Sequence, residues 1–425
     1  MDRRIYSGAN VPRGPAITIE HEGESLRAYE GEPLAVALHA AGVVVLGRSI
    51  KYHRPRGAFC LAGHCGACLM RVGDVPNLRA CQLPCTDGLA TQGQNAFPTT
   101  DLDVLAATDW LFPGGLDHHT LMTGSKVMNR VMQRVVRKLS GLGKLPARPA
   151  EAFPAVVERD VDVVVVGGGP AGLAAARAAA EAGRRTLLLD EQDELGGSLL
   201  DTPGLGRDEA ARRAREVAAA GVDVSTQTTL VAFFPEEDVL AAVTPAGLLR
   251  VVARRYVYAT GAHDVNALFV DNDRPGILAA RAVARLLLRH GVAPGDAVAI
   301  AGDAPTAEPL AGALAAAGIA FERCARPERA RGRKQVEALD VDGARLACDV
   351  VAVAEMPAPA SEAPRTHGVH VELRPAGGGF AVVVDGNGRT SVPGVYACGD
   401  VTGYVGPAAA AAQGAAAGAN AARTL

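Results

Sequence analysis

Five of the eight cysteines fall between Cys60 and Cys85, and the spacing of four of them is that of an iron–sulfur ligand set. From Cys60 to Cys68 the thiols are separated by four and then by two residues, and Cys81 follows after twelve more. This C-x4-C-x2-C…C arrangement binds [2Fe–2S] clusters of the plant type. Three thiolates on one tight loop and a fourth from a neighbouring segment can surround two irons. We therefore predict a [2Fe–2S] cluster held by Cys60, Cys65, Cys68 and Cys81.

Alternatives to this ligand set stay open. A zinc site is one, although zinc modules usually pair two C-x2-C units and this segment contains one. A loop without metal is another, and Cys85 could replace Cys81 because the two are close in sequence. His64 lies inside the loop, but a Rieske-type role would need two suitably placed histidines, so we do not expect it to be a ligand.

A glycine-rich turn in the middle of the chain predicts a dinucleotide site. Four valines (163–166) are typical of a buried parallel strand, and G-x-G-x-x-G glycines follow at once: Gly167, Gly169 and Gly172. A helix (173–182) and a second strand (186–189) complete the pattern of a nucleotide-binding βαβ unit. The glycines admit a pyrophosphate to the helix N-terminus, and Asp190 or Glu191 would bind the ribose hydroxyls. A βαβ unit without a ligand is the alternative.

A second strand-turn-helix pattern gives the sequence a weak two-fold echo, because residues 297–323 have the layout of residues 163–190. In place of the three expected glycines stand Gly302, Ala304 and Ala307. A Cβ at the second position should crowd a pyrophosphate. We therefore expect a vestigial, structural domain here, with real NAD(P) binding as the alternative.

The far end of the chain bears on which nucleotide the first site takes. Residues 390–400 predict a strand that ends in Gly399 and Asp400. Here the sequence resembles flavoproteins with two dinucleotide-binding domains, whose second FAD motif ends in this Gly-Asp pair. In them the aspartate contacts the ribityl or phosphate region, and the next helix, at 406–412 in this sequence, points at the flavin ring. Residues 259–261 match the family's Ala-Thr-Gly strand end near the flavin. The resemblance implies FAD.

Five further segments resemble one narrower group: residues 48–57, 190–192, 196–199, 259–263 and 272–276. They are similar to the α subunit of heterotetrameric sarcosine oxidase and to related bacterial amine and amino-acid dehydrogenases. Hydrogen cyanide synthase, opine oxidases and D-hydroxyproline dehydrogenase belong to the same group. The resemblance covers nearly the whole chain. It implies an α-type flavoprotein with a [2Fe–2S] unit, and a separate β subunit whose own flavin oxidises the C–N bond of an amine or amino acid.

The cofactor-binding residues that we predict include those that the resemblance implies. They are Gly167, Gly169, Pro170, Ala171, Gly172, Asp190, Glu191, Gln192, Gly197, Ser198, Val231, Ala259, Thr260, Gly261, Gly399, Asp400 and Pro407. We assign no catalytic residue, because no general base is convincingly placed and His263 is explained as well by a structural role.

The sequence also departs from this group. The sarcosine oxidase α subunit lacks the cluster cysteines and has a long folate-binding C-terminal half, whereas this chain keeps the cysteines and ends at Leu425. Many dehydrogenase α subunits end in a cysteine-rich domain that is missing here. The cluster module, often a separate subunit, is fused to the flavin module. These departures argue against sarcosine and folate chemistry.

The elements that must position these residues predict an α/β fold. We expect two Rossmann-like dinucleotide-binding domains preceded by a small α+β (β-grasp ferredoxin-like) domain. Strands over 16–20 and 25–29 and a helix over 33–41 open that small domain. The expected boundaries are 1–100 for the [2Fe–2S] domain, 101–157 for a linker with a basic helix over 125–142, 158–265 with 376–425 for the FAD domain, and 266–375 for the NAD(P)-like domain.

Composition narrows the class of protein. The 425 residues carry 43 Lys and Arg against 46 Asp and Glu, which argues against a nucleic-acid or anionic-membrane partner recognised by bulk charge. We find neither a segment apolar enough to span a membrane nor a signal peptide, so we expect a cytoplasmic protein.

These features together predict an electron-transfer function. Flavin can take two electrons and release them singly, while a [2Fe–2S] cluster carries one, so the pair makes a relay. We expect the electron-transfer subunit of an amine or amino-acid dehydrogenase or oxidase complex. An NAD(P)H-dependent ferredoxin-type reductase and a scaffold with a structural FAD are the alternatives.

Overall fold

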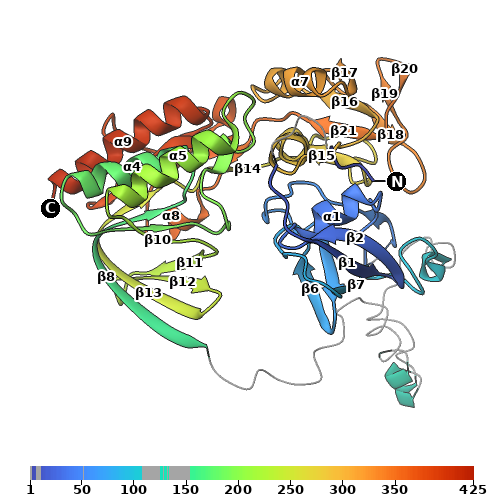
Figure 1. Cartoon of the computed structure of the whole chain (residues 1–425), viewed down its shortest axis with the longest axis horizontal. Coiled ribbons are helices and arrows are strands. Elements are labelled where there is room, and N and C mark those ends of the chain that lie inside the picture. The colour runs from blue at the N-terminus through green and yellow to red at the C-terminus, as the bar shows by residue number, and fades with distance from the viewer. Residues whose placement is uncertain are drawn as a thin grey trace. The chain divides into compact units, whose positions relative to one another are not determined.

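The structure, a computed structural model, describes residues 2–5, 11–50, 52–107, 125–127, 129–131, 133 and 154–425. The chain forms two compact units, each built from two stretches (Figure 1). Unit 1 contains Met1–Pro149 and Asn266–Glu355, and unit 2 contains Ala150–Val265 and Met356–Leu425. Most of the helix expected over 125–142, and of the linker that precedes residue 154, lies outside the described residues.

The first part of unit 1 is a five-stranded sheet with the order β2-β1-β7-β5-β6. Its elements are β1 (Ala16–His21), β2 (Glu24–Tyr29), α1 (Leu34–Ala40), β3 (Gly47–Arg48), β4 (Pro55–Arg56), β5 (Leu69–Val72), β6 (Val75–Arg79), β7 (Ala90–Gln92) and the 3-10 turn η1 (Val104–Ala106). The β1–β2 hairpin closes through Glu22 and Gly23, whose positive φ angles of 50° and 90° suit a tight hairpin turn. All residues of α1 are buried, so this helix forms the centre of the module.

The second part of unit 1 is a parallel sheet with the order β15-β21-β16-β17. Its elements are β15 (Ile277–Ala279), α6 (Ala280–Ala284), the π-helix η3 (Arg285–Arg289), β16 (Ala297–Ala301), α7 (Ala307–Ala316), β17 (Ala320–Cys324), β18 (Arg329–Arg331), β19 (Ala338–Val341), β20 (Ala344–Ala347) and β21 (Val350–Val353). One hydrophobic core joins both parts, because Leu38 and Met70 belong to the same buried cluster as Leu286 and Ile300.

Unit 2 contains a seven-stranded sheet with the order β10-β9-β8-β13-β12-β11, and β25 pairs with β13. Its main elements are β8 (Ala155–Val166), α4 (Pro170–Glu181), β9 (Thr186–Leu189), η2 (Gly197–Leu199), α5 (Gly206–Ala219), β10 (Asp223–Ser225), β11 (Thr229–Phe234), β12 (Val239–Thr244), β13 (Gly247–Tyr258), β25 (Val395–Ala397), η5 (Gly399–Thr402) and α9 (Pro407–Arg423). Val163 and Val165 pack into the core that contains α4 and α9, whereas Val164 and Val166 pack into another core. Burial on both faces explains the run of four valines.

Smaller elements complete unit 2. They are β14 (Ala262–His263), β22 (Ala358–Pro359), α8 (Glu362–Thr366), β23 (Val371–Arg374), η4 (Pro375–Gly377) and β24 (Gly379–Val382). The second stretch of this unit begins at Met356, against an expected start of the FAD domain at 376. The earlier start follows from pairing, because β22 pairs with β14 and the Ala360 N–H donates to the Gly261 carbonyl at 3.0 Å.

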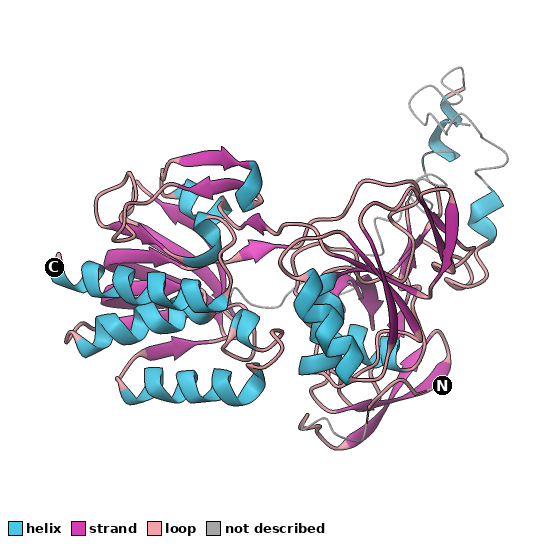
Figure 2. Cartoon of the chain, turned by 90° about the horizontal axis from the view of Figure 1, so that it is seen from above, coloured by secondary structure: helices cyan, strands magenta, loops and turns pink. Residues whose placement is uncertain are grey.

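Helices α4 and α9 lie side by side, with the C-terminus of the chain just beyond α9 (Figure 1 and Figure 2). A Cβ on Gly414 would overlap the Ala171 carbonyl, and one on Gly418 would overlap the Ala175 carbonyl. The two backbones therefore touch, which only glycine permits.

The fold class expected from the sequence is confirmed, including the two-fold echo of strand, glycine turn and helix at β8–α4 and β16–α7. The strand expected over 390–400 is shorter, because β25 ends at Ala397 and η5 follows. Among the described helices, none combines the length and the apolar character that a membrane crossing requires.

Candidate cofactor sites

The predicted cluster ligands come together in two pairs within unit 1. The Cys60 thiol lies within hydrogen-bond distance of Cys65, and the Cys68 thiol lies within hydrogen-bond distance of Cys81. The bond from the Cys65 thiol lowers the pKa of Cys60 to about 5, and the bond from Cys81 lowers the pKa of Cys68. The charge on Cys60 is also felt at both members of the other pair. Each pair therefore stabilises a thiolate, the form that binds metal.

The backbone of the cysteine loop supplies donors and turns. The Ala62 N–H donates to the Cys60 sulfur and the Ala67 N–H donates to the Cys65 sulfur, each at 3.4 Å. Gly63 has φ +85°, and a Cβ there would overlap the Gln82 side chain. N–H···S bonds of this kind tune the potential of iron–sulfur clusters.

The pairing of the thiols suits two irons better than one zinc ion. A structural zinc site brings four ligands to one point. Among the residues that the structure describes, no group of three or more His, Cys, Asp and Glu side chains is gathered in a way that could hold a metal ion. Two pairs of thiolates can instead hold two irons, one pair on each. The residues present fit a [2Fe–2S] cluster.

Cys85 lies in a different environment from the two pairs. Its thiol is fully buried, and burial, followed by the charge of Glu32, raises its pKa to about 12. The charge of Arg4 acts in the opposite direction. Because the neighbours that influence this thiol are Glu32 and Arg4, the geometry favours Cys81 as the fourth ligand. His64 is exposed.

In unit 2, the first glycine turn is shaped by two close approaches within the protein. Gly167 has φ +104°, and a Cβ there would overlap the Ala259 carbonyl. A Cβ on Gly172 would overlap the Gly167 carbonyl, so this position lets α4 pack on the strand end. Both glycines are therefore required by the fold itself.

Gly169 is required by neither conformation nor packing. It precedes α4 with φ −76° and ψ −172°, which any residue can adopt, and the nearest atom to a Cβ at this position would be Gly197 Cα at 4.0 Å. The space beside it is therefore open, as expected where a pyrophosphate approaches a helix N-terminus. Pro170 and Ala171 form the first turn of that helix.

A second loop lies over this turn. The Gly196 N–H donates to the Gly168 carbonyl at 2.9 Å, and a Cβ on Gly197 would come within 2.9 Å of Gly169 Cα. Ser198 follows in η2. The structure thus brings Gly197 and Ser198 to the phosphate turn, as the sequence predicts.

The predicted ribose-binding residues already take part in the local structure. The Asp190 carboxylate accepts a hydrogen bond from the Gly168 N–H at 2.5 Å and one from the Gln192 N–H at 2.8 Å. Glu191 accepts from the Gln192 side-chain amide at 3.3 Å. Asp190 therefore ties the strand end to the glycine turn, and its contact with a ribose stays a prediction.

Val231 lies apart from these residues in the hydrogen-bond pattern. It sits at a bulge in β11 and is 57% exposed. The residue that reaches the Asp190 carbonyl is Thr228, whose N–H donates at 2.8 Å, and Gln227 makes a similar bond to Gln192 at 2.9 Å. Sequence inspection did not single out this segment, because the only signal for it is its position just before β11.

The remaining predicted FAD residues follow β13 and β25. The Thr260 hydroxyl donates to the Ala360 carbonyl at 2.7 Å, and Gly261 has φ +75° with open space around its Cα. Asp400 is 9% exposed, and its carboxylate accepts from the Val405 and Gly406 N–H groups at 2.9 and 3.2 Å. Asp400 thus orients the start of α9, where Pro407 is the first residue.

All of these segments follow the carboxyl ends of parallel strands: β8, β9, β13 and β25. Open α/β sheets bind their ligands at this edge. The residues of unit 2 fit an FAD at the position that the sequence predicts.

The second glycine turn, in unit 1, has the same shape but less freedom. Gly302 has φ +109°, and a Cβ there would overlap the Ala354 carbonyl, as Gly167 does with Ala259. The Ala304 N–H donates to that same carbonyl at 3.2 Å, and Ala304 is 9% exposed. An amide committed to the fold and a buried Cβ both disfavour a pyrophosphate here.

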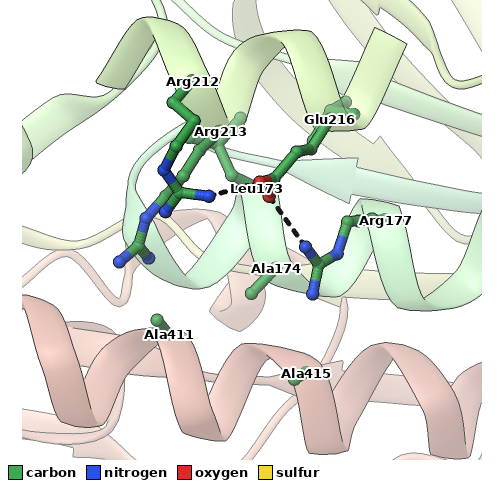
Figure 3. Close-up of a pocket in the computed structure, with 9 residues that line it drawn as sticks. Leu173, Ala174, Arg177, Arg212, Arg213, Glu216, Ala411 and Ala415 are labelled. Atoms are coloured by element: carbon green, nitrogen blue, oxygen red, sulfur yellow. Dashed lines mark hydrogen bonds and ion pairs between the residues drawn. The ribbon is translucent and has the colours of Figure 1, made fainter. Parts of the chain in front are cut away.

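A pocket of about 250 Å³ lies between α4, α5 and α9 (Figure 3). Its charged residues are paired: the Glu216 carboxylate accepts from Arg177 at 2.7 Å and from Arg212. Leu173 and the Ala411 and Ala415 methyl groups supply apolar lining. We assign no cofactor to it.

Three protein-family matches agree with these two sites. A 2Fe-2S iron-sulfur cluster binding domain matches residues 14–96, an FAD dependent oxidoreductase matches residues 162–209, and a pyridine nucleotide-disulphide oxidoreductase matches residues 292–416. The chain is an iron–sulfur flavoprotein of the oxidoreductase class, with FAD and a [2Fe–2S] cluster as its cofactors.

Similar proteins narrow this class. The chain is 34% identical over 346 residues to the alpha subunit of sarcosine oxidase from Rhizobium meliloti (strain 1021), covering 74% of this chain and 35% of that protein. It is 30% identical over 169 residues to the first of the opine oxidase subunits (A) of the same organism, covering 37% of each. The solved structure of L-proline dehydrogenase from P. horikoshii aligns with 100% of this chain and 76% of that chain, with a TM-score of 0.77 and 24% identity, and shows the fold.

The chain is an α-subunit-like flavoprotein of the sarcosine oxidase and opine oxidase group, joined to a [2Fe–2S] domain. It spans about a third of the length of the curated relatives that it matches.

Proposed function

We propose that this chain is the α-type electron-transfer subunit of a heteromeric amine or amino-acid dehydrogenase or oxidase. A partner β subunit with its own flavin oxidises the substrate C–N bond, and this chain relays electrons between FAD and the [2Fe–2S] cluster. The observation that carries the proposal is the presence, in one chain similar to such α subunits, of an FAD-type phosphate turn and two cysteine pairs. Reduced thiols also suit the cytoplasm, where we place the protein.

The roles of the chain's own residues follow from their geometry. The N-terminus of α4 beside Gly169 receives the pyrophosphate, and Asp400 holds the start of α9 in place. Cys60, Cys65, Cys68 and Cys81 hold the cluster. When bound, FAD supplies the conversion between two-electron and one-electron transfer. His263 lies 3.4 Å from the Glu362 carboxylate, and we assign it no proton transfer.

An anaerobic visible spectrum of the purified chain, before and after NADH and NADPH, tests this proposal. We expect both cofactors to stay oxidised, and to be reduced when the amine substrate is added together with the partner subunit. Amine oxidation by the purified chain alone, at a rate typical of enzymes, would contradict the relay.

One observation favours a second candidate function, an NAD(P)H-dependent ferredoxin-type reductase. Residues 292–416 match the pyridine nucleotide-disulphide oxidoreductase family, and Gly302 keeps the first glycine of a nucleotide turn. Prompt bleaching of the flavin by NADH or NADPH would support this function instead.

A further inference from the structure

Arg285 brings a permanent positive charge from the second part of unit 1 to the cysteine loop. It is the first residue of η3 and is 9% exposed. Its guanidinium Nη1 donates to the Cys60 carbonyl oxygen at 2.5 Å, in a buried hydrogen bond. The same two segments are joined next to this bond, because the Ala279 N–H donates to the Phe59 carbonyl at 3.1 Å.

The position of this arginine is fixed by packing. Val283, Leu286 and Leu287, on both sides of it, are 0%, 0% and 6% exposed. They belong to the same buried cluster as the cysteine-loop residues Leu61, Cys68 and Cys81. The contact between Arg285 and Cys60 is therefore part of the folded core of unit 1.

A buried guanidinium has a definite effect on a redox centre beside it. It stays protonated at every relevant pH, and its field is screened less in a protein interior than in water. An iron–sulfur cluster gains one negative charge when it accepts an electron. A fixed positive charge nearby stabilises the reduced form more than the oxidised form and raises the reduction potential.

We propose that Arg285 is a positioning residue for the [2Fe–2S] cluster, which fixes the Cys60 end of the loop and raises the cluster's reduction potential. The inference rests on the proposed cluster ligands. It gives the nucleotide-like part of unit 1 a role that needs no nucleotide: it carries the charge that makes the cluster a better electron acceptor.

Three variants of the full chain, purified anaerobically with both cofactors, test the proposal. Arg285→Gln removes the charge and keeps a donor for the Cys60 carbonyl, whereas Arg285→Lys keeps the charge. Arg326→Gln is the control, because it removes an exposed arginine from the same unit. A dye-mediated redox titration, followed by the EPR signal of the reduced cluster, gives each midpoint potential without substrate or partner.

We expect a lower midpoint potential in Arg285→Gln and near-wild-type potentials in Arg285→Lys and Arg326→Gln. Loss of the cluster in Arg285→Gln but not in Arg285→Lys would also support the proposal. An unchanged potential in Arg285→Gln, an equal shift in Arg285→Lys, or loss of the cluster in both would overturn it. A wild-type cluster that titrates normally but never receives electrons from FAD would instead contradict the proposed function.

Discussion

At the phosphate turn, Gly169 differs from its neighbours because the protein itself has room for a side chain there. We predict that Gly169→Ser leaves the apoprotein folded, with a change in unfolding free energy below about 1 kcal/mol, because Ser is a favoured residue before a helix. The hydroxymethyl group would fill the space left for the pyrophosphate. FAD affinity should fall at least tenfold, or about 1.4 kcal/mol, in a fluorescence titration of the apoprotein.

Gly167→Ser is the matched control for this prediction. At that position φ is +104° and a Cβ would overlap the Ala259 carbonyl, so the substitution should destabilise the apoprotein itself. If Gly169→Ser bound FAD as tightly as the wild type, the phosphate turn would be wrongly assigned.

The two candidate fourth ligands can be separated by matched substitutions. We predict that Cys81→Ser lowers the iron content and the [2Fe–2S] absorbance sharply, because Cys81 pairs with Cys68. Cys85→Ser should keep the cluster, since that thiol lies near Glu32 and Arg4. Iron analysis of anaerobic preparations measures both. The reverse pattern would make Cys85 the ligand.

His39 makes the stability of unit 1 depend on pH. It is 6% exposed, its Nε2 lies 2.8 Å from the Pro294 carbonyl, and burial lowers its pKa to about 4 from 6.5. The unfolded chain therefore binds a proton more readily, and the contribution is complete above pH 6.5 and lost as pH falls towards 4. Linkage puts the loss at about 3 kcal/mol.

His39→Gln is the variant that checks this pH dependence, because Gln can donate to the Pro294 carbonyl but does not titrate in this range. Chemical denaturation of both proteins at pH 7 and pH 5 should show a smaller acid-induced loss in the variant. Equal losses would mean that His39 is not the group responsible.

At the scale of elements, the contact between α4 and α9 depends on two glycines. We predict that Gly414→Ala and Gly418→Ala each destabilise unit 2 by about 1–3 kcal/mol, because a methyl group would overlap the carbonyls of Ala171 and Ala175. In α7, by contrast, a Cβ on Gly312 would meet no atom within 4 Å. Gly312→Ala should therefore be neutral or stabilising by up to about 1 kcal/mol. Denaturant titrations compare the three variants.

The sequence predicts those elements whose signals are local. The four valines and the glycines after them specify β8, the phosphate turn and α4, and the cysteine spacing specifies a loop on which thiols can meet. The contact of Arg285 with Cys60 is not predictable in this way, because it joins residues far apart in the sequence. Val231 shows the same limit, since its neighbours depend on how β11 pairs.

Glycines carry different information in the two nucleotide turns. Gly167 and Gly302 are both required by a nearby carbonyl, so they specify the fold and say little about a ligand. The residue at the second position is informative: Gly169 leaves open space, whereas Ala304 is buried and its N–H is used. This difference could be predicted from the sequence, and the structure supplies its physical reason.

At the scale of the whole molecule, each compact unit carries one cofactor. In unit 1 the cluster module is bound to the nucleotide-like part by a shared core and by ion pairs, such as Arg54 with Asp271 at 2.6 Å and Arg56 with Asp273 at 2.6 Å. In unit 2 the FAD segments all lie at one edge of one sheet. The electron relay therefore requires transfer between two units of a single chain.

The most direct test of this account is an anaerobic reductive titration of the purified chain, with electrons supplied to the flavin by light and a donor. Visible absorption follows the flavin and EPR follows the cluster. The account predicts one FAD and one [2Fe–2S] cluster per chain, with the cluster signal rising as the flavin bands bleach. A flavin that is fully reduced while the cluster stays oxidised would contradict it, and so would a chain that holds no cluster.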